Sequence, residues 1–400
     1  MLDEYDIGRA RRGLLHIPAL SAWCRLAHED GRSPLPPVDD VAELATLLIS
    51  NRLGPAVSRA LRLRTRTGEG VGQGSGRAAD ELGIAPELAV ILREDARRAA
   101  ECSLHAVATL RLVAASLDRV GIAWMLWKGP AISLMAWDEP GRRQFSDLDI
   151  VVAPRDRDMA RQALAADGWN ARDHFSVAQE RAVHAATRAY PLVRAGCTMV
   201  ELHWSFAGSH YPSWGDVAAI AGRARTLDLG GIAVRTPAAA DALLLSALHG
   251  TKHGWSQAED AVLFARLATR EPGALAVATA RADELGVGTA VRLGVRLAAR
   301  VCGVRLSESP VSGAEDARVE SMADECIARM QASTGPWRET HAWTLGWVRR
   351  PIDRLRYAGV AAFAPTPQES NWVALPDALA WAYPAVRLAR LAMRSVGLAR

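Results

Sequence analysis

Apolar residues recur every three or four positions along residues 1–60 and again over 86–119, a spacing that predicts amphipathic helices. Between these segments, glycine occupies every second position from 68 to 76. This run follows no predicted strand and lacks the register of a phosphate-binding glycine loop, so we interpret it as a flexible linker. Residues 1–100 are therefore predicted to form an N-terminal helical region with a glycine-rich linker near 68–76.

The pattern then changes to short apolar runs with turns and helices between them. Runs at 122–127 and 145–152 predict two buried strands, and the segment 189–206 predicts a hairpin. One more short strand is expected at 231–237. These elements predict a small mixed α/β unit over residues 101–236.

Helical periodicity returns at Thr236-Pro237, where we expect Thr236 to cap a helix and Pro237 to occupy its first position. Further helices are expected over 274–303. The last segment, PAVRLARLAMRSVGLAR, predicts a basic amphipathic helix that packs on the body of the protein or, alternatively, contacts a membrane surface. Residues 237–400 are thus predicted to be a C-terminal helical domain, and the fold class is α+β.

Composition limits the classes of protein and partner. Of the 400 residues, 50% are hydrophobic and 23% are charged, which is typical of a globular protein and excludes a disordered chain. The net charge of +4 and the absence of a long basic run give no indication of a nucleic-acid partner. Five scattered cysteines without a C-x-x-C pair indicate a reducing compartment. With no signal-peptide pattern and no long uncharged apolar run, we expect a cytoplasmic protein without a transmembrane segment.

Lysine is unusually scarce. Of the 48 basic residues only Lys128 and Lys252 are lysines, and the other 46 are arginines. In such a chain a retained lysine suggests a position that needs a compact ammonium rather than a guanidinium fork. Chance survival of two lysines is the alternative.

Three carboxylates are candidates for metal binding. Asp147 and Asp149 stand two apart in a predicted strand, so their side chains share one face. Adjacent carboxylates repel one another and need a compensating cation, and their oxygens suit Mg²⁺ or Mn²⁺. Glu201, within the apolar run 199–202, is a natural third ligand. A strand end in water is the alternative for the aspartates, and an ion pair with an arginine is the alternative for Glu201.

A phosphate site is predicted beside these carboxylates. Lys128-Gly129 ends one predicted strand and begins a helix opened by Pro130. Backbone N–H groups at a helix N-terminus are favourable to anions, so a phosphate is a suitable ligand there.

Taken in order, the segments LWKGPAISLMAWDEPGRRQFSDLDIVV, VELHWSF and TPAAADALLLSALHGTKHGW resemble the nucleotidyltransferase-like family of bacterial proteins in the polymerase-β superfamily. The resemblance covers about residues 100 to 270, and a weaker similarity extends to the end of the chain. It implies a small mixed-sheet, polymerase-β-like nucleotidyltransferase core flanked by N- and C-terminal helical regions.

The resemblance also implies roles for individual residues. Asp147, Asp149 and Glu201 would be the catalytic carboxylates and would hold two divalent ions, Mg²⁺ or Mn²⁺. Gly129 would let the backbone approach the triphosphate, and Lys128 would neutralise it. By matching the family motifs, the nucleotide-binding set would also include Arg143, His249, Lys252 and His253, with His203 and Ser146 as supporting residues.

Two departures from the family pattern stand out. The superfamily's usual Gly-Ser after the first strand is replaced by Lys-Gly-Pro, so the phosphate-binding serine is absent. An aspartate is often found about eight residues after the motif tryptophan, but Leu263 stands there, with Glu259 and Asp260 nearby. An acidic role for this helix is therefore left open.

The implied activity is two-metal transfer of a nucleoside monophosphate from an NTP, with ATP expected, to a hydroxyl acceptor. The acceptor would be a small molecule, a peptide or a glycan, and the setting metabolite or peptide biosynthesis. The alternatives are a non-catalytic nucleotide-binding or adaptor protein that keeps the same fold, and a modifier that adenylylates a partner protein.

Overall fold

The computed structural model describes residues 17–35, 38, 40–66, 84–173, 175–307, 313–332 and 340–395. The predicted glycine-rich linker lies outside the described residues. The expected N-terminal helices are present as α2 (Ile17–His28), α3 (Val41–Ser50), α4 (Gly54–Arg66) and the long α5 (Pro86–Arg119). Helix α5 runs continuously through residue 100, where the sequence placed a boundary between two regions. That division of the chain stays a prediction.

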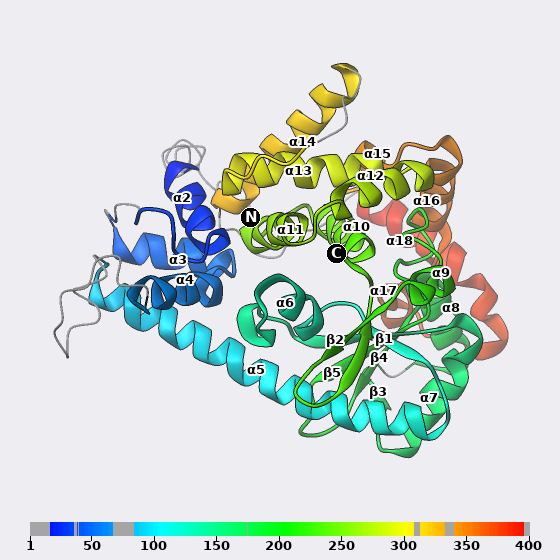
Figure 1. The fold of residues 1–400 in the computed structure, drawn as a ribbon. Coiled ribbons are helices and arrows are strands. Elements are labelled where there is room, and N and C mark those ends of the chain that lie inside the picture. The colour runs from blue at the N-terminus through cyan, green and yellow to red at the C-terminus, as the bar shows by residue number, and fades with distance from the viewer. Residues whose placement is uncertain are drawn as a thin grey trace.

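A five-stranded mixed sheet, called the central sheet below, lies in the lower right part of Figure 1. Its β2 and β5 strands are parallel, and its other pairs are antiparallel. The strands expected at 122–127 and 145–152 and the expected hairpin are confirmed. In sheet order the strands are β1 (Trp124–Leu126), β2 (Asp147–Val152), β5 (Met199–His203), β4 (Ala189–Val193) and β3 (Asn170–Ala171). The strand expected at 231–237 is β7 (Ala233–Thr236), which pairs with β6 (Arg225–Asp228) in a separate two-stranded sheet.

The two faces of the central sheet differ, as the alternation along β2 requires. Leu148, Ile150 and Val152 belong to a core cluster that also contains apolar side chains of α5 and α7 (Arg157–Ala166). Val151 points to the opposite side and joins a larger core that extends to the N- and C-terminal helices. Asp147 and Asp149 have the same parity as Val151, so they lie on this second face.

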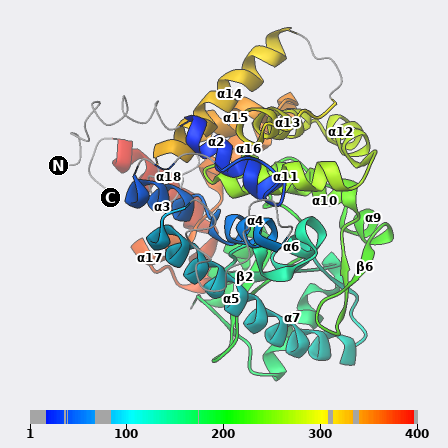
Figure 2. The same cartoon turned by 60° about the vertical axis from the view of Figure 1, so that its left-hand side comes forward.

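The remaining helices lie beside the sheet or pack on one another, and the predicted C-terminal helical segment is confirmed as helical. They are α6 (Pro130–Trp137), α8 (Val177–Thr187), α9 (Val217–Gly222), α10 (Ala239–Lys252), α11 (Ala258–Arg270), α12 (Ala274–Leu285), α13 (Gly288–Cys302), α14 (Gly313–Ala332), α15 (His341–Trp347), α16 (Pro351–Phe363), α17 (Pro367–Trp372) and α18 (Tyr383–Ser395), with short 3₁₀ turns at Pro140–Arg142, Pro154–Asp156 and Asp377–Ala382. Figure 2 shows α2 beside α11 and α13, so helices from both ends of the chain pack together.

The expected start of α10 is wrong by two residues. Thr236 is buried and is the last residue of β7, where it pairs with Arg225. The helix begins at Ala239, and its N-cap residue Ala238 makes no side-chain cap. Thr236 therefore takes part in strand pairing instead of capping the helix as the sequence pattern had predicted.

One described helix, α5, is long and apolar enough to cross a membrane by length and composition alone. No such helix was expected from the sequence. In the structure 44% of its most apolar window is buried inside the protein, where it packs against α4 and β2. Core helices commonly pass the same test.

The basic C-terminal helix packs on the body of the protein. Arg390 of α18 is buried and donates to Glu369 of α17 at 2.6 Å. Tyr383, also buried, accepts a hydrogen bond from Gln179 of α8 at 2.5 Å. These contacts attach the end of the described chain to a helix beside the central sheet.

Candidate functional site

The pairing of β2 with β5 brings acidic residues from distant segments side by side. In this parallel register Asp149 is opposite Glu201, and Asp147 is opposite Met199. Directly opposed residues in neighbouring strands project from the same face, so the carboxylates of Asp147, Asp149 and Glu201 share it. Asp149 is buried, while Asp147 and Glu201 are half-buried.

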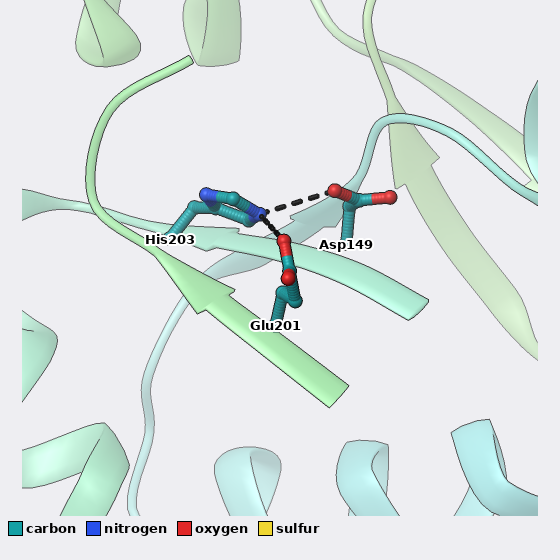
Figure 3. A group of neighbouring side chains, drawn as sticks. All are labelled: Asp149, Glu201 and His203. Atoms are coloured by element: carbon teal, nitrogen blue, oxygen red, sulfur yellow. Dashed lines mark hydrogen bonds and ion pairs between the residues drawn. The ribbon is translucent and has the colours of Figure 1, made fainter. Parts of the chain in front are cut away.

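His203 completes a compact group with two of these carboxylates (Figure 3). Its Nε2 atom lies 3.1 Å from Oδ1 of Asp149 and 3.2 Å from Oε2 of Glu201. One potential metal-ligating atom from each of the three residues lies within 4.8 Å of the other two. Asp147 is on the same face but outside this compact group, and its predicted role as a metal ligand stays a prediction.

Lys128 supplies the opposite charge. Its ammonium donates to Oδ1 of Asp149 at 2.8 Å and lies 4.2 Å from the centre of the Trp127 ring. Burial by itself raises the pKa of Asp149, but the positive charge of Lys128 and the hydrogen bond from His203 outweigh it and hold that pKa below its ordinary value. Asp149 is therefore an anion over the whole neutral range.

The same cluster of charges shifts the pKa values of Asp147, Glu201 and His203. Burial, together with the charges of Asp149 and Glu201, raises the pKa of Asp147 to about 6. The hydrogen bond from His203 lowers the pKa of Glu201. Burial opposes the positive charge of His203, but its hydrogen bonds to Asp149 and Glu201 prevail and raise its pKa. Such mutual perturbation inside a cavity is typical of functional sites.

A cavity of about 460 Å³ opens above this face of the sheet. Its size falls within the roughly 300–1,000 Å³ usual for small-molecule and cofactor sites. All the residues proposed from the sequence lie in its lining: Lys128, Gly129, Arg143, Ser146, Asp147, Asp149, Glu201, His203, His249, Lys252 and His253. The structure thus brings the proposed set together, and the role of each residue stays a prediction.

Gly129 forms the wall where β1 leads into α6. It is the N-cap of α6, with φ 58° and ψ −131°, a conformation that favours glycine. A Cβ atom at this position would meet nothing closer than the carbonyl oxygen of Asp147 at 3.6 Å. The backbone conformation, rather than lack of space, therefore explains this glycine.

The C-terminal end of α10 contributes His249, Lys252 and the C-cap residue His253 to the cavity lining. The rings of His249 and His253 lie 4.5 Å apart, and the ring of His249 lies 6.2 Å from Trp127. The ammonium of Lys252 lies 5.6 Å from the centre of the Tyr211 ring. Both lysines of the chain therefore line one cavity, as predicted from the sequence.

Arg143 is held by the acidic start of α11. Its Nη2 atom donates to Oδ1 of Asp260 at 2.9 Å and lies 3.2 Å from Oε2 of Glu259. Burial raises the pKa of Glu259 to about 7. The sequence left open whether the acidic residues of this helix have a role. In the structure they hold Arg143 in place.

Part of the lining was not predicted from the sequence. Arg52, Trp127, Phe206 and Trp214 also line the cavity. Trp127 and Phe206 lie inside the quoted segments but had no proposed role, and their rings lie 5.5 Å apart. Arg52 and Trp214 stand in segments without any motif, so no pattern in the sequence could have found them.

Comparison with known proteins gives one family. Residues 38–303 match the family described as "Uncharacterised nucleotidyltransferase". A solved structure, titled "Crystal structure of an antigenic nucleotidyltransferase-like protein from Paracoccidioides brasiliensis", matches with 17% identity and a TM-score of 0.30, over 46% of this chain and 91% of that chain. The search of curated proteins finds no match. The family match spans more than half of the 400 residues and includes the entire cavity lining, and the chain therefore belongs to this nucleotidyltransferase family.

Proposed function

We propose that this protein transfers a nucleoside monophosphate from an NTP to a hydroxyl acceptor, with Asp147, Asp149 and Glu201 as its catalytic carboxylates. The observation that carries the proposal is the pairing of Asp149 with Glu201 on adjacent parallel strands at the floor of a cavity of about 460 Å³. Membership of a nucleotidyltransferase family supports this class of reaction.

The donor set fits a divalent metal ion. Three carboxylates face one cavity, and hard oxygen donors of this kind suit Mg²⁺ or Mn²⁺. When bound, such ions neutralise phosphate charge and make an acceptor hydroxyl more acidic. Lys128 compensates one of the three carboxylates, and the raised pKa of Asp147 reflects negative charge that a bound cation would neutralise.

Phosphate binding would use groups around the carboxylates. Lys128 neutralises Asp149 in the structure and stands next to Gly129, so its ammonium is placed to exchange a carboxylate partner for a phosphate. Gly129, which lines the cavity, is the N-cap of α6, so the positive end of this helix lies beside the cavity. Lys252 adds a second compact cation to the lining of the same cavity.

The reaction would then depend on positioning and charge neutralisation. A hydroxyl of the acceptor attacks the α-phosphorus in line, and pyrophosphate leaves. Asp147, whose pKa is raised to about 6, is still mostly ionised at neutral pH and is available as a third carboxylate ligand. Arg143, fixed by α11, is available to orient a phosphate oxygen from a constant position.

We propose ATP as the donor and a small molecule, peptide or glycan as the acceptor, in metabolite or peptide biosynthesis. A cytoplasmic setting agrees with the five cysteines, all of which are free in the structure.

Asp149→Asn is the direct test of the carboxylate site. The substitution keeps the volume of the side chain but removes one charge, so we expect metal-dependent NTP affinity to fall by about ten-fold or more. Calorimetry with each NTP and Mg²⁺ or Mn²⁺ measures this. Asp158→Asn, at an exposed carboxylate of α7 outside the cavity, is the matched control and should bind like the wild type. Equal affinity in Asp149→Asn and the wild type would refute the site.

Transfer is tested with NTPs labelled on the α-phosphate. Label that reaches a small-molecule, peptide or glycan acceptor, with release of pyrophosphate, supports the proposal. NTP binding without release of pyrophosphate would favour the adaptor alternative. Label on a partner protein would favour the adenylylating modifier.

Lys252→Arg tests the retained lysine. It keeps the charge and changes only the shape of the cation, so we expect weaker NTP binding if a compact ammonium is required. Lys252→Ala removes the charge and should weaken binding further. If neither variant changes NTP affinity or transfer, Lys252 has no role in binding the nucleotide.

A further inference from the structure

The compact group at the cavity floor combines oxygen and nitrogen donors. Asp149 and Glu201 contribute carboxylate oxygens, and His203 contributes the Nε2 atom of its ring. Figure 3 shows this nitrogen directed at both carboxylates. A group made of three carboxylates alone would be purely oxygen, so the imidazole changes which cations the group suits.

The strand register explains why the imidazole takes this position. Asp149 and Glu201 form one opposed pair in β2 and β5. Asp147 lies two residues before Asp149, and His203 lies two residues after Glu201, opposite Val151. The central carboxylate pair therefore has a third carboxylate at one end and an imidazole at the other, all on one face of the sheet.

The distances suit ligands of a single ion. Two ligand atoms bound at right angles to one ion, each at about 2.1 Å, lie about 3.0 Å apart. The Nε2 atom of His203 lies 3.1 Å from Asp149 and 3.2 Å from Glu201. The N–H group of His203 shares its hydrogen bond between these two oxygens, and a cation that replaces this proton would bind all three atoms.

The imidazole is also held in place. His203 is largely buried, and its ring packs edge-on against Trp127 with ring centres 6.4 Å apart. A ligand that is oriented before the ion arrives loses little conformational freedom on binding.

We propose that His203 is a metal ligand together with Asp149 and Glu201, and that its nitrogen makes this site select Mn²⁺ over Mg²⁺. The inference rests on the metal-dependent function proposed above and goes beyond its carboxylate ligands. Mg²⁺ prefers oxygen ligands, whereas transition-metal ions accept imidazole, so the mixed donor set carries the selectivity.

The test uses the full chain, freed of metal with a chelator, and Mn²⁺ as the probe. Binding is followed by loss of the electron paramagnetic resonance signal of free Mn²⁺, with Mg²⁺ as competitor. Pulsed measurement of the same samples detects ¹⁴N modulation from a directly bound imidazole. We expect this modulation in the wild type, with Mn²⁺ bound about ten-fold or more tightly than Mg²⁺.

Two variants test which histidine supplies the nitrogen bound to Mn²⁺. His203→Gln should abolish the ¹⁴N modulation and weaken Mn²⁺ binding by about 10–100-fold. His249→Gln removes a different imidazole from the lining of the same cavity and should keep the modulation. If the wild type binds Mn²⁺ without ¹⁴N modulation, or if His203→Gln retains it, the proposal is wrong. Should His203→Gln fail to fold, the wild-type spectrum and its persistence in His249→Gln still decide between these outcomes.

Failure of the proposed function would look different. Absence of label transfer from every NTP would overturn nucleotidyl transfer but leave the ¹⁴N spectrum of bound Mn²⁺ unchanged. Transfer of label with Mg²⁺ and Mn²⁺ equally, without ¹⁴N modulation, would support the function and overturn the role of His203.

Discussion

Glu259 offers the sharpest prediction about stability, because its carboxyl group is buried without a hydrogen-bond partner among the described residues. It is 1% exposed. The nearby Arg143 guanidinium lies 3.2 Å away but gives its hydrogen bond to Asp260 at 2.9 Å. We predict that Glu259→Gln, which removes the charge and keeps the volume, stabilises the protein above neutral pH.

The direction of this stability change follows from proton linkage. Burial raises the pKa of Glu259 from 4.5 to about 7 in the folded protein. Between these values the folded state binds more protons than the unfolded state, so the stability of the wild type falls as the pH rises through this window. Each pKa unit is equivalent to about 1.36 kcal/mol, so the full loss is about 3 kcal/mol above pH 7. Glutamine does not titrate and avoids the loss.

Denaturant unfolding of both proteins at several values between pH 5 and pH 8 measures the effect. Other titrating groups are common to the two proteins and cancel in the difference. Relative to the wild type, the free energy of unfolding of Glu259→Gln should rise little at pH 5 and by about 2–3 kcal/mol at pH 8. Asp260→Asn is the control, since it weakens the hydrogen bond that Arg143 does make, and it should destabilise the protein at pH 8. A loss of about 3–5 kcal/mol in Glu259→Gln at pH 8 would refute the reasoning, because it would mean that the ion pair with Arg143 is essential.

Three further predictions concern buried charge and glycine. Asp241→Asn should cost about 3 kcal/mol in denaturant unfolding, because this buried carboxylate accepts from two arginine side chains at 3.0 and 2.7 Å. An unchanged midpoint would show that solvent satisfies both arginines. Gly250→Ala should cost about 1–3 kcal/mol, since its Cβ atom would lie 2.8 Å from the Trp255 ring, and a wild-type melting temperature would contradict this. Gly129→Ala should cost about 1–3 kcal/mol through its φ of 58°, whereas Gly222→Ala, with nothing within 4 Å, should be nearly neutral. Equal losses in these last two variants would argue against backbone strain at Gly129.

Strands β1 and β2 could be predicted because each lies in a short apolar run, and the structure buries almost every residue of both. In DLDIVV the alternation placed Asp147 and Asp149 on one face, and the structure has them there. The opposition of Asp149 and Glu201 could only be assumed, because a parallel register between segments some 50 residues apart depends on the packing of everything between them. The motif histidine in VELHW was assigned a supporting role, and only the distances show that its ring meets both carboxylates.

Other features depend on contacts that no local pattern encodes. The pairing of Arg143 with α11 joins residues far apart in the sequence, so the acidic residues of α11 had no assignment before the structure was known. The error at Thr236 has the same origin. Thr-Pro before an apolar helix resembles a cap, but pairing between β6 and β7 takes the threonine into a strand.

The scarcity of lysine gains a physical explanation from the structure. Many arginines make the multiple contacts that a planar fork allows, as Arg223 does with both oxygens of Asp241 and Arg266 does with Ala136 and Asp30. An ammonium presents a compact charge that can change partners without breaking a two-point contact. Lys128 holds such a position, on a carboxylate that a metal ion would also use. Both lysines of this arginine-rich chain line one cavity, which is the arrangement expected if an ammonium that can change ionic partners is needed there.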